Sequence, residues 1–197
     1  RTISSMATGD VSGARGKNVS AVEGDGAFGA FYGLTRILSG AYGTTLVTAY
    51  SKGSESVPYL ITNAAFDPIY MRSLGLDMVT SCALQARRYM KRYGISEEEC
   101  ALVAVKNRGN ALANPNAHQG MRITVEDVMR SPKIADPLKF YDISPISDGA
   151  CCIILAREDR AKKITHRPVW VKGVSFCADA YLLGDRELSE CLALEKA

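Results

Sequence analysis

The sequence predicts an α/β fold. Two apolar runs rich in β-branched or small residues, Thr44 to Tyr50 and Ala150 to Leu155, have the length and composition of buried strands. Around them lie segments whose apolar residues recur at helical spacing. The 197 residues are 47% hydrophobic and 23% charged, which suits a chain with one good core. Strands that alternate with helices in this way are typical of an α/β architecture.

The first fifty residues are expected to hold a loop, a short strand, a helix and a longer strand. Arg1 to Asn18 is rich in glycine, serine and threonine, and Val19 to Val22 is a short apolar strand candidate. Gly24 to Ser39 predicts a buried helix, because its apolar residues follow the helical period and Ser39-Gly40 supplies a stop signal. The strand Thr44 to Tyr50 follows.

Helices are expected to dominate the middle of the chain. Ser51 to Tyr70 has the composition of a loop, and Leu74 to Tyr93 predicts an amphipathic helix with basic residues in its last turn. Ser96 and Thr124 each precede an acidic side chain by three residues, which predicts two further helices that start with a capping box. The second of these helices should end before Pro132.

The last third of the chain is expected to return to strands. A short charged helix, Arg157 to Lys163, should follow the strand Ala150 to Leu155. Val169 to Val174 predicts another strand, and Ser175 to Ala197 ends in a charged amphipathic segment.

Charge and cysteine content limit the class of protein. A formal net charge of +3 gives little reason to expect a nucleic-acid ligand. No run reaches the roughly 18 apolar residues that span a bilayer, and Arg1 to Arg15 lacks the apolar core of a secretory leader, so we expect a cytoplasmic protein. Six cysteines without a Cys-x-x-Cys pair predict reduced, buried thiols, and with two histidines no metal site is expected.

Two segments carry the most specific information. Lys106 to His118 reads KNRGNALANPNAH, and Pro145 to Ala150 reads PISDGA. In this order and at this spacing they resemble the thiolase superfamily, and more narrowly the sterol-carrier-protein type of thiolase and thiolase-like proteins. The resemblance implies an αβαβα layered fold and an acyl-coenzyme A thioester as substrate, with no other cofactor bound.

The resemblance runs from about Val19 to Leu188 and implies a partial chain. Residues 1–50 would be part of the N-terminal thiolase-like domain, 51–144 an inserted loop domain, 145–166 the end of the N-terminal domain and 167–197 the start of the C-terminal domain. The histidine motifs of the family's second half are not present in the sequence. We therefore expect a fragment, or one subunit of a split protein.

The resemblance also shows where a nucleophile should be. In the family, the first residue of a buried helix is a cysteine that carries the acyl group, because a helix N-terminus stabilises a thiolate. An ungapped alignment of Val19 to Gly26 puts Glu23 at that place. A second register, which matches Val22-Glu23 to a Val-Glu of the family, puts Gly26 there and needs a shortened helix. We prefer the first register, and neither supplies a cysteine.

Two carboxylates become the candidate catalytic residues. Glu23 could move a proton in chemistry that needs no acyl-enzyme, such as retro-aldol cleavage of a β-hydroxyacyl-CoA. Alternatively, Glu23 is a capping carboxylate in a subunit that is not catalytic. Asp25 could share the pocket or compensate the helix dipole.

Candidate substrate-binding residues lie in the first signature segment. Asn107, Asn114 and His118 could bind the thioester or the pantetheine arm, although asparagine in turns mostly bonds its own backbone. Asp148 is interpreted as a structural turn carboxylate, and Cys82 as a core residue. Four basic residues could pair with the phosphates of CoA, but a solvated helix face is the default for them: Arg87, Arg88, Lys91 and Arg92.

Three functions remain open from the sequence, two of them enzymatic. The first is a thiolase-like lyase that cleaves an acyl-CoA by retro-aldol chemistry. The second is an acyltransferase, or thiolase subunit of a heteromeric complex, with the cysteine supplied elsewhere, and the third is a non-catalytic scaffold. We expect either a homodimer, paired through the edge of the Thr44 to Tyr50 strand, or a complex with a small OB-fold or zinc-ribbon protein.

Overall fold

The structure, a computed structural model, describes residues 9–197 in two compact units. The first consists of the described residues up to Ser51 together with Gly149–Val174, and the second of Lys52–Asp148 together with Ser175–Ala197. The loop expected at Arg1 to Asn18 lies partly outside the described residues. From Asp10 the chain runs to Asn18 through turns.

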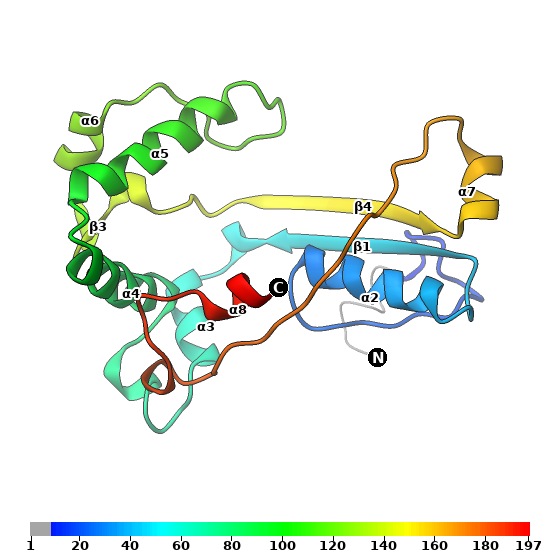
Figure 1. The fold of residues 1–197 in the computed structure, drawn as a ribbon, viewed down its shortest axis with the longest axis horizontal. Helices are drawn as coiled ribbons and strands as arrows, with labels where there is room; N and C mark the ends of the chain where they lie inside the picture. Colours follow the sequence, from blue (N-terminus) through cyan, green and yellow to red (C-terminus); the bar gives the residue numbers. More distant parts are fainter. Residues whose placement is uncertain (1–8) are drawn as a thin grey trace. The chain divides into compact units, whose positions relative to one another are not determined.

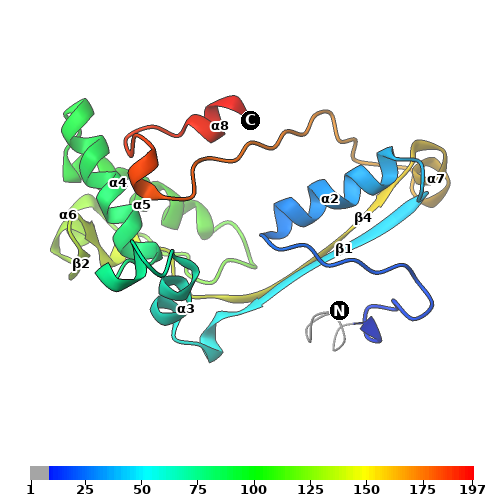
Figure 2. The ribbon, with the colours of Figure 1, turned by 90° about the horizontal axis from the view of Figure 1, so that it is seen from below.

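The first unit is a helix against a two-stranded sheet. Strands β1 (Thr44–Lys52) and β4 (Asp148–Ala156) are hydrogen-bonded to each other and run in opposite directions, as Figures 1 and 2 show. Helix α2 (Gly26–Leu38) lies along this sheet, and α7 (Glu158–Ile164) follows β4. The α/β class and these four elements confirm the prediction.

Glycines bring α2 close to β1. A Cβ added at Gly26 would lie 3.3 Å from the Cβ of Ala49, one at Gly29 would lie 3.4 Å from Cγ1 of Val47, and one at Gly33 only 2.5 Å from Cγ2 of Val47. The three positions recur at i, i+3 and i+7, and therefore share one helix face. The backbone of the helix thus approaches the strand more closely at Gly33 than a larger residue would allow.

Replacing Gly33 with alanine is expected to destabilise the protein by up to about 2 kcal/mol. The added methyl group would clash with Val47 and come within 3.1 Å of Cδ1 of Leu155. Overpacking of this kind costs about 1–3 kcal/mol and outweighs the roughly 1 kcal/mol that alanine gains over glycine in a helix. Urea unfolding measures the change. Gly29→Ala is the matched control: its methyl group makes an ordinary contact, so it should be neutral or stabilising.

Some strand predictions for this unit were wrong. The chain has no regular secondary structure at Val19 to Val22 or at Val169 to Val174. Strand β1 was predicted to be buried, but its burial alternates along the strand, because α2 covers one face only. Strand β4 is exposed over most of its length. Among the described elements, none covers the second face of this sheet.

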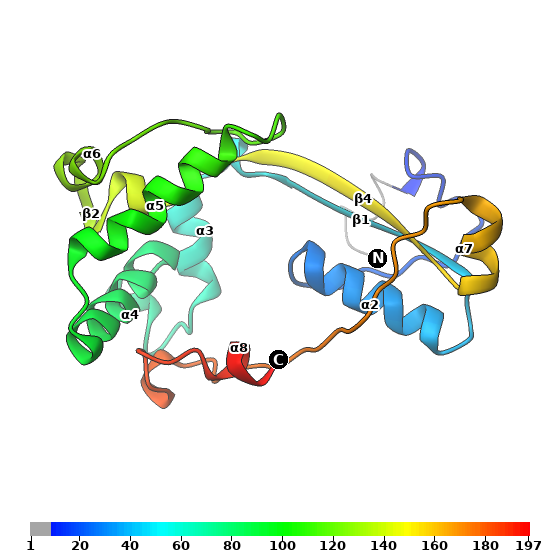
Figure 3. The same ribbon diagram turned by 45° about the horizontal axis from the view of Figure 1, so that its top comes forward.

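The second unit is mainly helical (Figure 3). Its elements are α3 (Pro58–Ala65), α4 (Met78–Tyr93), α5 (Glu97–Ala111), α6 (Val125–Arg130), the antiparallel pair β2 (Lys133–Ala135) and β3 (Leu138–Lys139), α8 (Leu192–Lys196), and short 3-10 turns at Gly53–Glu55, Arg72–Leu74, Phe140–Asp142 and Leu183–Asp185. The stretch from Ser51 to Tyr70 was predicted to be a loop, and α3 corrects this. Its start was missed because Pro58, the first residue of the helix, was interpreted only as a loop residue.

Capping boxes fix three helix starts in this unit. Those predicted at Ser96 and Thr124 are confirmed: each side chain accepts a hydrogen bond from the third residue of its helix. The third is at Asp77, whose carboxylate accepts from the N–H of Thr80, 2.8 Å away. Helix α4 therefore begins four residues later than the predicted Leu74.

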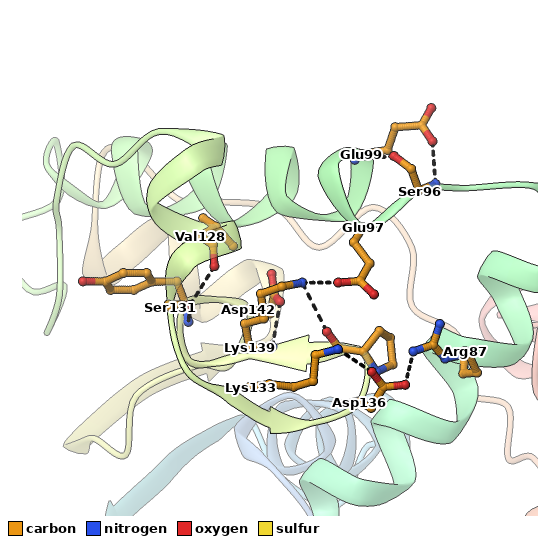
Figure 4. A network of polar contacts seen from close by, with 12 residues as sticks. Arg87, Ser96, Glu97, Glu99, Val128, Ser131, Lys133, Asp136, Lys139 and Asp142 are labelled. Atoms are coloured by element: carbon orange, nitrogen blue, oxygen red, sulfur yellow. Dashed lines mark hydrogen bonds and ion pairs between the residues drawn. The ribbon is translucent and has the colours of Figure 1, made fainter.

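The core of the second unit lies where α5 meets α6 and the β2–β3 pair. Ala101 on α5 and Val128 on α6 are fully buried. Beside them, Nζ of Lys139 donates to the carboxylate of Glu97 at 2.5 Å, and the Lys139 side chain is only 6% exposed (Figure 4). An ion pair thus replaces apolar packing at this point of the core.

The cysteines are not buried as predicted. All six are free, but Cys82, Cys151, Cys152 and Cys191 are exposed. Cys82 lies on the side of α4 away from the buried Ser81 and Ala83, and the other exposed thiols lie on β4 or next to α8. Within residues 9–197, no helix is long and apolar enough to cross a membrane.

Candidate functional site

An apolar pocket of about 370 Å³ lies in the second unit. This volume falls within the range of roughly 300–1,000 Å³ that is common for small-molecule sites. Two stretches of the chain, about a hundred residues apart, form its walls. The lining residues are Tyr70, Met71, Leu74, Leu76, Leu84, Leu182, Leu183, Gly184, Asp185 and Leu188.

Local hydrogen bonds hold the first wall in place. The side-chain amide of Asn63, on α3, donates to the carbonyl oxygens of Arg72 (3.2 Å) and Leu76 (2.7 Å). Between them Gly75 adopts a left-handed conformation, with φ of 74°, which ends the 3-10 turn and leads to the N-cap of α4. Backbone geometry therefore helps to set the positions of Leu74 and Leu76, on either side of Gly75, in addition to apolar packing.

The second wall is a segment that we call the strap, residues 179–190. The hydroxyl of Tyr181 donates to the carbonyl oxygen of Ala65 at 2.9 Å. The guanidinium of Arg186 donates to Asp179 at 3.1 Å and to Gln85 of α4 at 3.2 Å. The strap thus contributes five of the ten lining residues and is anchored to α3 and α4.

Ion pairs with α4 continue this anchoring. Arg88 donates from Nε and Nη2 to the two carboxylate oxygens of Glu187, each at 2.8 Å. Arg92 donates to Ser189 at 3.1 Å and lies 2.7 Å from a carboxylate oxygen of Glu190. The hydrogen bonds from Arg88 and then Ser189 hold the pKa of Glu187 far below its ordinary value, so the carboxylate stays charged.

These pairs bear on the hypothesis that the basic residues of α4 bind the phosphates of CoA. Arg88 and Arg92 already face carboxylates of the strap, and Arg87 pairs with Asp136 (Figure 4). Phosphate binding would require those pairs to open. The arrangement instead gives the arginines a structural role next to the pocket.

The predicted substrate-binding residues lie outside this pocket. Asn107 is an exposed residue of α5, which continues beyond it to Ala111. Asn114 accepts a hydrogen bond from the N–H of Asn116 at 3.0 Å, which is the local turn bonding expected of asparagine. Over the described part of the chain, no hydrogen bond joins Asn107 or Asn114 to His118.

His118 belongs to a second polar group, with Ser147, Asp148 and Ser54. Its Nδ1 lies 2.8 Å from the hydroxyl of Ser147. The adjacent Asp148 accepts from the hydroxyl (2.6 Å) and the N–H (2.9 Å) of Ser54, and these bonds lower its pKa. Asp148 therefore joins two segments 94 residues apart, in line with the structural role inferred from the sequence.

Glu23 and Asp25 lie at the start of α2, in the first unit. Asp25 is the N-cap of the helix, and its carboxylate accepts from the N–H of Phe28 at 2.9 Å. Glu23 is exposed and lies three residues before Gly26, the first residue of the helix. The register that puts Gly26 at the family's nucleophile position agrees with this helix start better than the register that puts Glu23 there. In both registers the position lacks a thiol.

The sequence interpretation missed the pocket. The pairing of residues 70–84 with the strap depends on contacts between distant segments, which a local sequence pattern does not predict. The one available signal was local: Asp185, Arg186 and Glu187 are three successive charged residues between apolar ones, which is typical of a segment held by ion pairs.

Similarities to known proteins place this chain beside thiolases and thiolase-like enzymes. Residues 75–159 match the N-terminal domain of thiolases. An acetyl-CoA acetyltransferase of Methanothermobacter thermautotrophicus is 37% identical over 155 residues, which cover 78% of this chain and 40% of that protein. A steroid side-chain-cleaving aldolase of Thermomonospora curvata is 37% identical over 94 residues, 47% of this chain and 24% of that protein.

The fold has a solved counterpart. The structure of an Ltp2-ChsH2(DUF35) aldolase superposes with a TM-score of 0.67 at 23% sequence identity, over 83% of this chain and 42% of that one. At this identity the likeness bears on the fold alone. The chain spans about 40% of the length of the archaeal acetyltransferases that it matches.

Proposed function

The chain belongs to the thiolase superfamily, and on this premise we propose that it acts on a β-hydroxyacyl-CoA thioester without an acyl-cysteine intermediate. The reaction is cleavage of a carbon–carbon bond of retro-aldol type. The coenzyme A thioester is the substrate. Residues 51–144 serve as the loop domain, between parts of an N-terminal thiolase-like domain at 1–50 and 145–166 and the start of a C-terminal one at 167–197.

The start of α2 carries the proposal. The first helical residue is Gly26, preceded by Gly24, which has φ of 134°, and by the cap Asp25. A thiolate is required where an acyl group is held on the enzyme between two half-reactions. Because no residue from Val19 to Phe31 is a cysteine, this segment supports chemistry that forms no such intermediate.

The proposed cleavage requires proton transfer but no covalent bond between the substrate and the protein. A base takes the proton of the β-hydroxyl, the bond between Cα and Cβ breaks, and Cβ leaves as the carbonyl carbon of an aldehyde or ketone. The electron pair remains on the thioester enolate, which takes a proton at Cα and becomes a shorter acyl-CoA. Glu23 is assigned as the base, because Asp25 already uses its carboxylate to cap the helix.

We expect Glu23→Gln in the full-length protein to lower kcat for cleavage of a β-hydroxyacyl-CoA by about 100-fold, within the usual contribution of a general base. The amide retains the size of the side chain but cannot accept the proton. Product formation is followed by chromatography of the shorter acyl-CoA. Glu98→Gln, an exposed acid at the start of α5, is the control and should retain full activity. Unchanged turnover of Glu23→Gln would remove Glu23 from catalysis.

Acyl transfer is the alternative, and the similarity to an archaeal acetyl-CoA acetyltransferase favours it. Incubation with acetyl-CoA followed by mass spectrometry separates the two. The lyase proposal expects no covalent acyl adduct. A stable acyl adduct on any cysteine would contradict the lyase proposal and support acyl transfer. If the protein bound no acyl-CoA at all, a non-catalytic scaffold would be the remaining function.

We also infer that the protein works in an assembly. The aldolase with a similar fold is named for two components, Ltp2 and ChsH2, which supports a heteromeric complex. The partner that we propose is a small OB-fold or zinc-ribbon protein. A homodimer through the free edge of β1 is the other arrangement, since in the described part of the chain β1 pairs with β4 alone.

A further inference from the structure

The contacts between α4 and the strap form a continuous row. Gln85, Arg88 and Arg92 of α4 contact, in the same order, Arg186, Glu187 and the Ser189-Glu190 pair. Residues three and four apart share one face of a helix, so these polar side chains line up along α4. The row fixes both the position of the strap and its register along the helix.

This row begins directly at the pocket. Leu84, which lines the pocket, lies one turn before Arg88 on α4, and Leu188, also a lining residue, directly follows Glu187. Each partner of the Arg88–Glu187 pair is therefore next to a leucine of an opposite wall. The pair therefore links the two walls of the pocket.

We propose that Arg88 is a positioning residue for acyl recognition, which sets the width of the apolar pocket by holding Glu187 and hence Leu188 against α4. The inference rests on the proposed function, because it takes the ligand to be an acyl-CoA, whose acyl chain the pocket would receive. It makes Arg88 a determinant of chain-length selectivity, although the arginine does not line the pocket and need not touch the substrate.

The geometry distinguishes Arg88 from its neighbours. It binds Glu187 through two parallel hydrogen bonds, which restrain orientation as well as distance. Arg87, on the same helix and equally exposed, pairs instead with Asp136 of the β2–β3 turn, away from the strap. The two arginines thus provide a matched pair: similar exposure and one carboxylate partner each, but only one of them anchors a pocket wall.

The test is binding of saturated acyl-CoAs, which have no β-hydroxyl and cannot be cleaved. Affinities of butyryl-CoA and decanoyl-CoA are measured by titration calorimetry for the full-length protein, Arg88→Met and Arg87→Met. A partly exposed ion pair contributes modestly to stability. We therefore expect Arg88→Met to weaken the binding of decanoyl-CoA by about fivefold and to leave the affinity for butyryl-CoA unchanged. Arg87→Met should change neither affinity.

Reversing the pair provides a rescue. The double variant Arg88→Glu with Glu187→Arg should recover most of the decanoyl-CoA affinity, whereas a general loss of folding would not be recovered. Equal weakening of both ligands by Arg88→Met, or no weakening of either, would overturn the inference. If the unmodified protein binds decanoyl-CoA no more tightly than butyryl-CoA, the pocket does not receive the acyl chain and the inference fails. If it binds neither ligand, the proposed function loses its substrate assignment as well.

Discussion

Replacing Glu97 with glutamine is expected to lower the free energy of unfolding by about 3 kcal/mol. The Lys139 ammonium, almost fully buried, has two partners: the Glu97 carboxylate and, at 3.4 Å, the carbonyl oxygen of Pro137 (Figure 4). Glutamine leaves this ammonium inside the protein without a compensating charge. Chemical denaturation at pH 7, followed by circular dichroism, measures the loss.

The same pair predicts how stability depends on pH. The hydrogen bond from Lys139 lowers the pKa of Glu97 from its ordinary 4.5. A carboxyl group with a lowered pKa stabilises the fold above its unfolded value, and this stability is lost as the pH falls through the folded value. The difference in the free energy of unfolding between the unmodified protein and Glu97→Gln should therefore be largest at neutral pH and shrink below about pH 4.5.

Two further variants identify the cause of the loss. Glu98→Gln, the exposed neighbour in the same first turn, should change stability by no more than about 0.5 kcal/mol. Combining Glu97→Gln with Lys139→Met removes the buried charge and should recover most of the stability. If Glu98→Gln costs as much as Glu97→Gln, the effect comes from the charge at the helix start and not from the ion pair.

Arg108→Ala should have an effect of similar size, about 3 kcal/mol. Arg108 is only 8% exposed, and its guanidinium donates to the carbonyl oxygens of Tyr141 (3.3 Å) and Ile143 (3.1 Å) and to the side chain of Gln119 (3.2 Å). It also lies over the Tyr141 ring, 5.2 Å from its centroid. Alanine would leave these partly buried acceptors without their donor and open a cavity at the junction of three segments.

Two control variants, one at Arg108 and one at an exposed position of the same helix, test this prediction. Arg108→Lys retains the charge but not the planar fork, so it should recover only a small part of the loss. Lys106→Ala, an exposed position two residues earlier, should be nearly neutral in the same urea titration. A loss from Arg108→Ala no larger than that from Lys106→Ala would mean that the three acceptors find other donors, such as water.

Local signals account for the part of the fold that the sequence predicted. A capping box needs two side chains three residues apart, so Ser96 and Thr124 could be recognised as helix starts. A strand needs a hydrogen-bonded partner, and apolar composition cannot supply one: Val169 to Val174 has the residues of a strand but joins no sheet in the described chain. Asp77 was missed because threonine, not an acid, completes its box.

The candidate site was predictable only where a residue acts near its own position in the chain. Asn114 makes the local turn bond that its residue type favours. The signature segment was expected to supply side chains to a substrate pocket, yet its most enclosed residue, Arg108, points into the protein and binds backbone carbonyls. The apolar pocket could not be anticipated, since the strap and residues 70–84 meet only after folding.

The row of polar contacts along α4 should make acyl-CoA affinity depend on salt concentration. Binding of an apolar group to a rigid cavity generally strengthens as salting-out ions are added. Here one wall is held by partly exposed ion pairs, whose attraction is screened over a few ångströms at molar ionic strength. The two effects oppose each other. Because screening is steepest at low ionic strength and salting-out grows steadily, the affinity for long acyl chains should first fall and then rise, with a minimum, as salt is added.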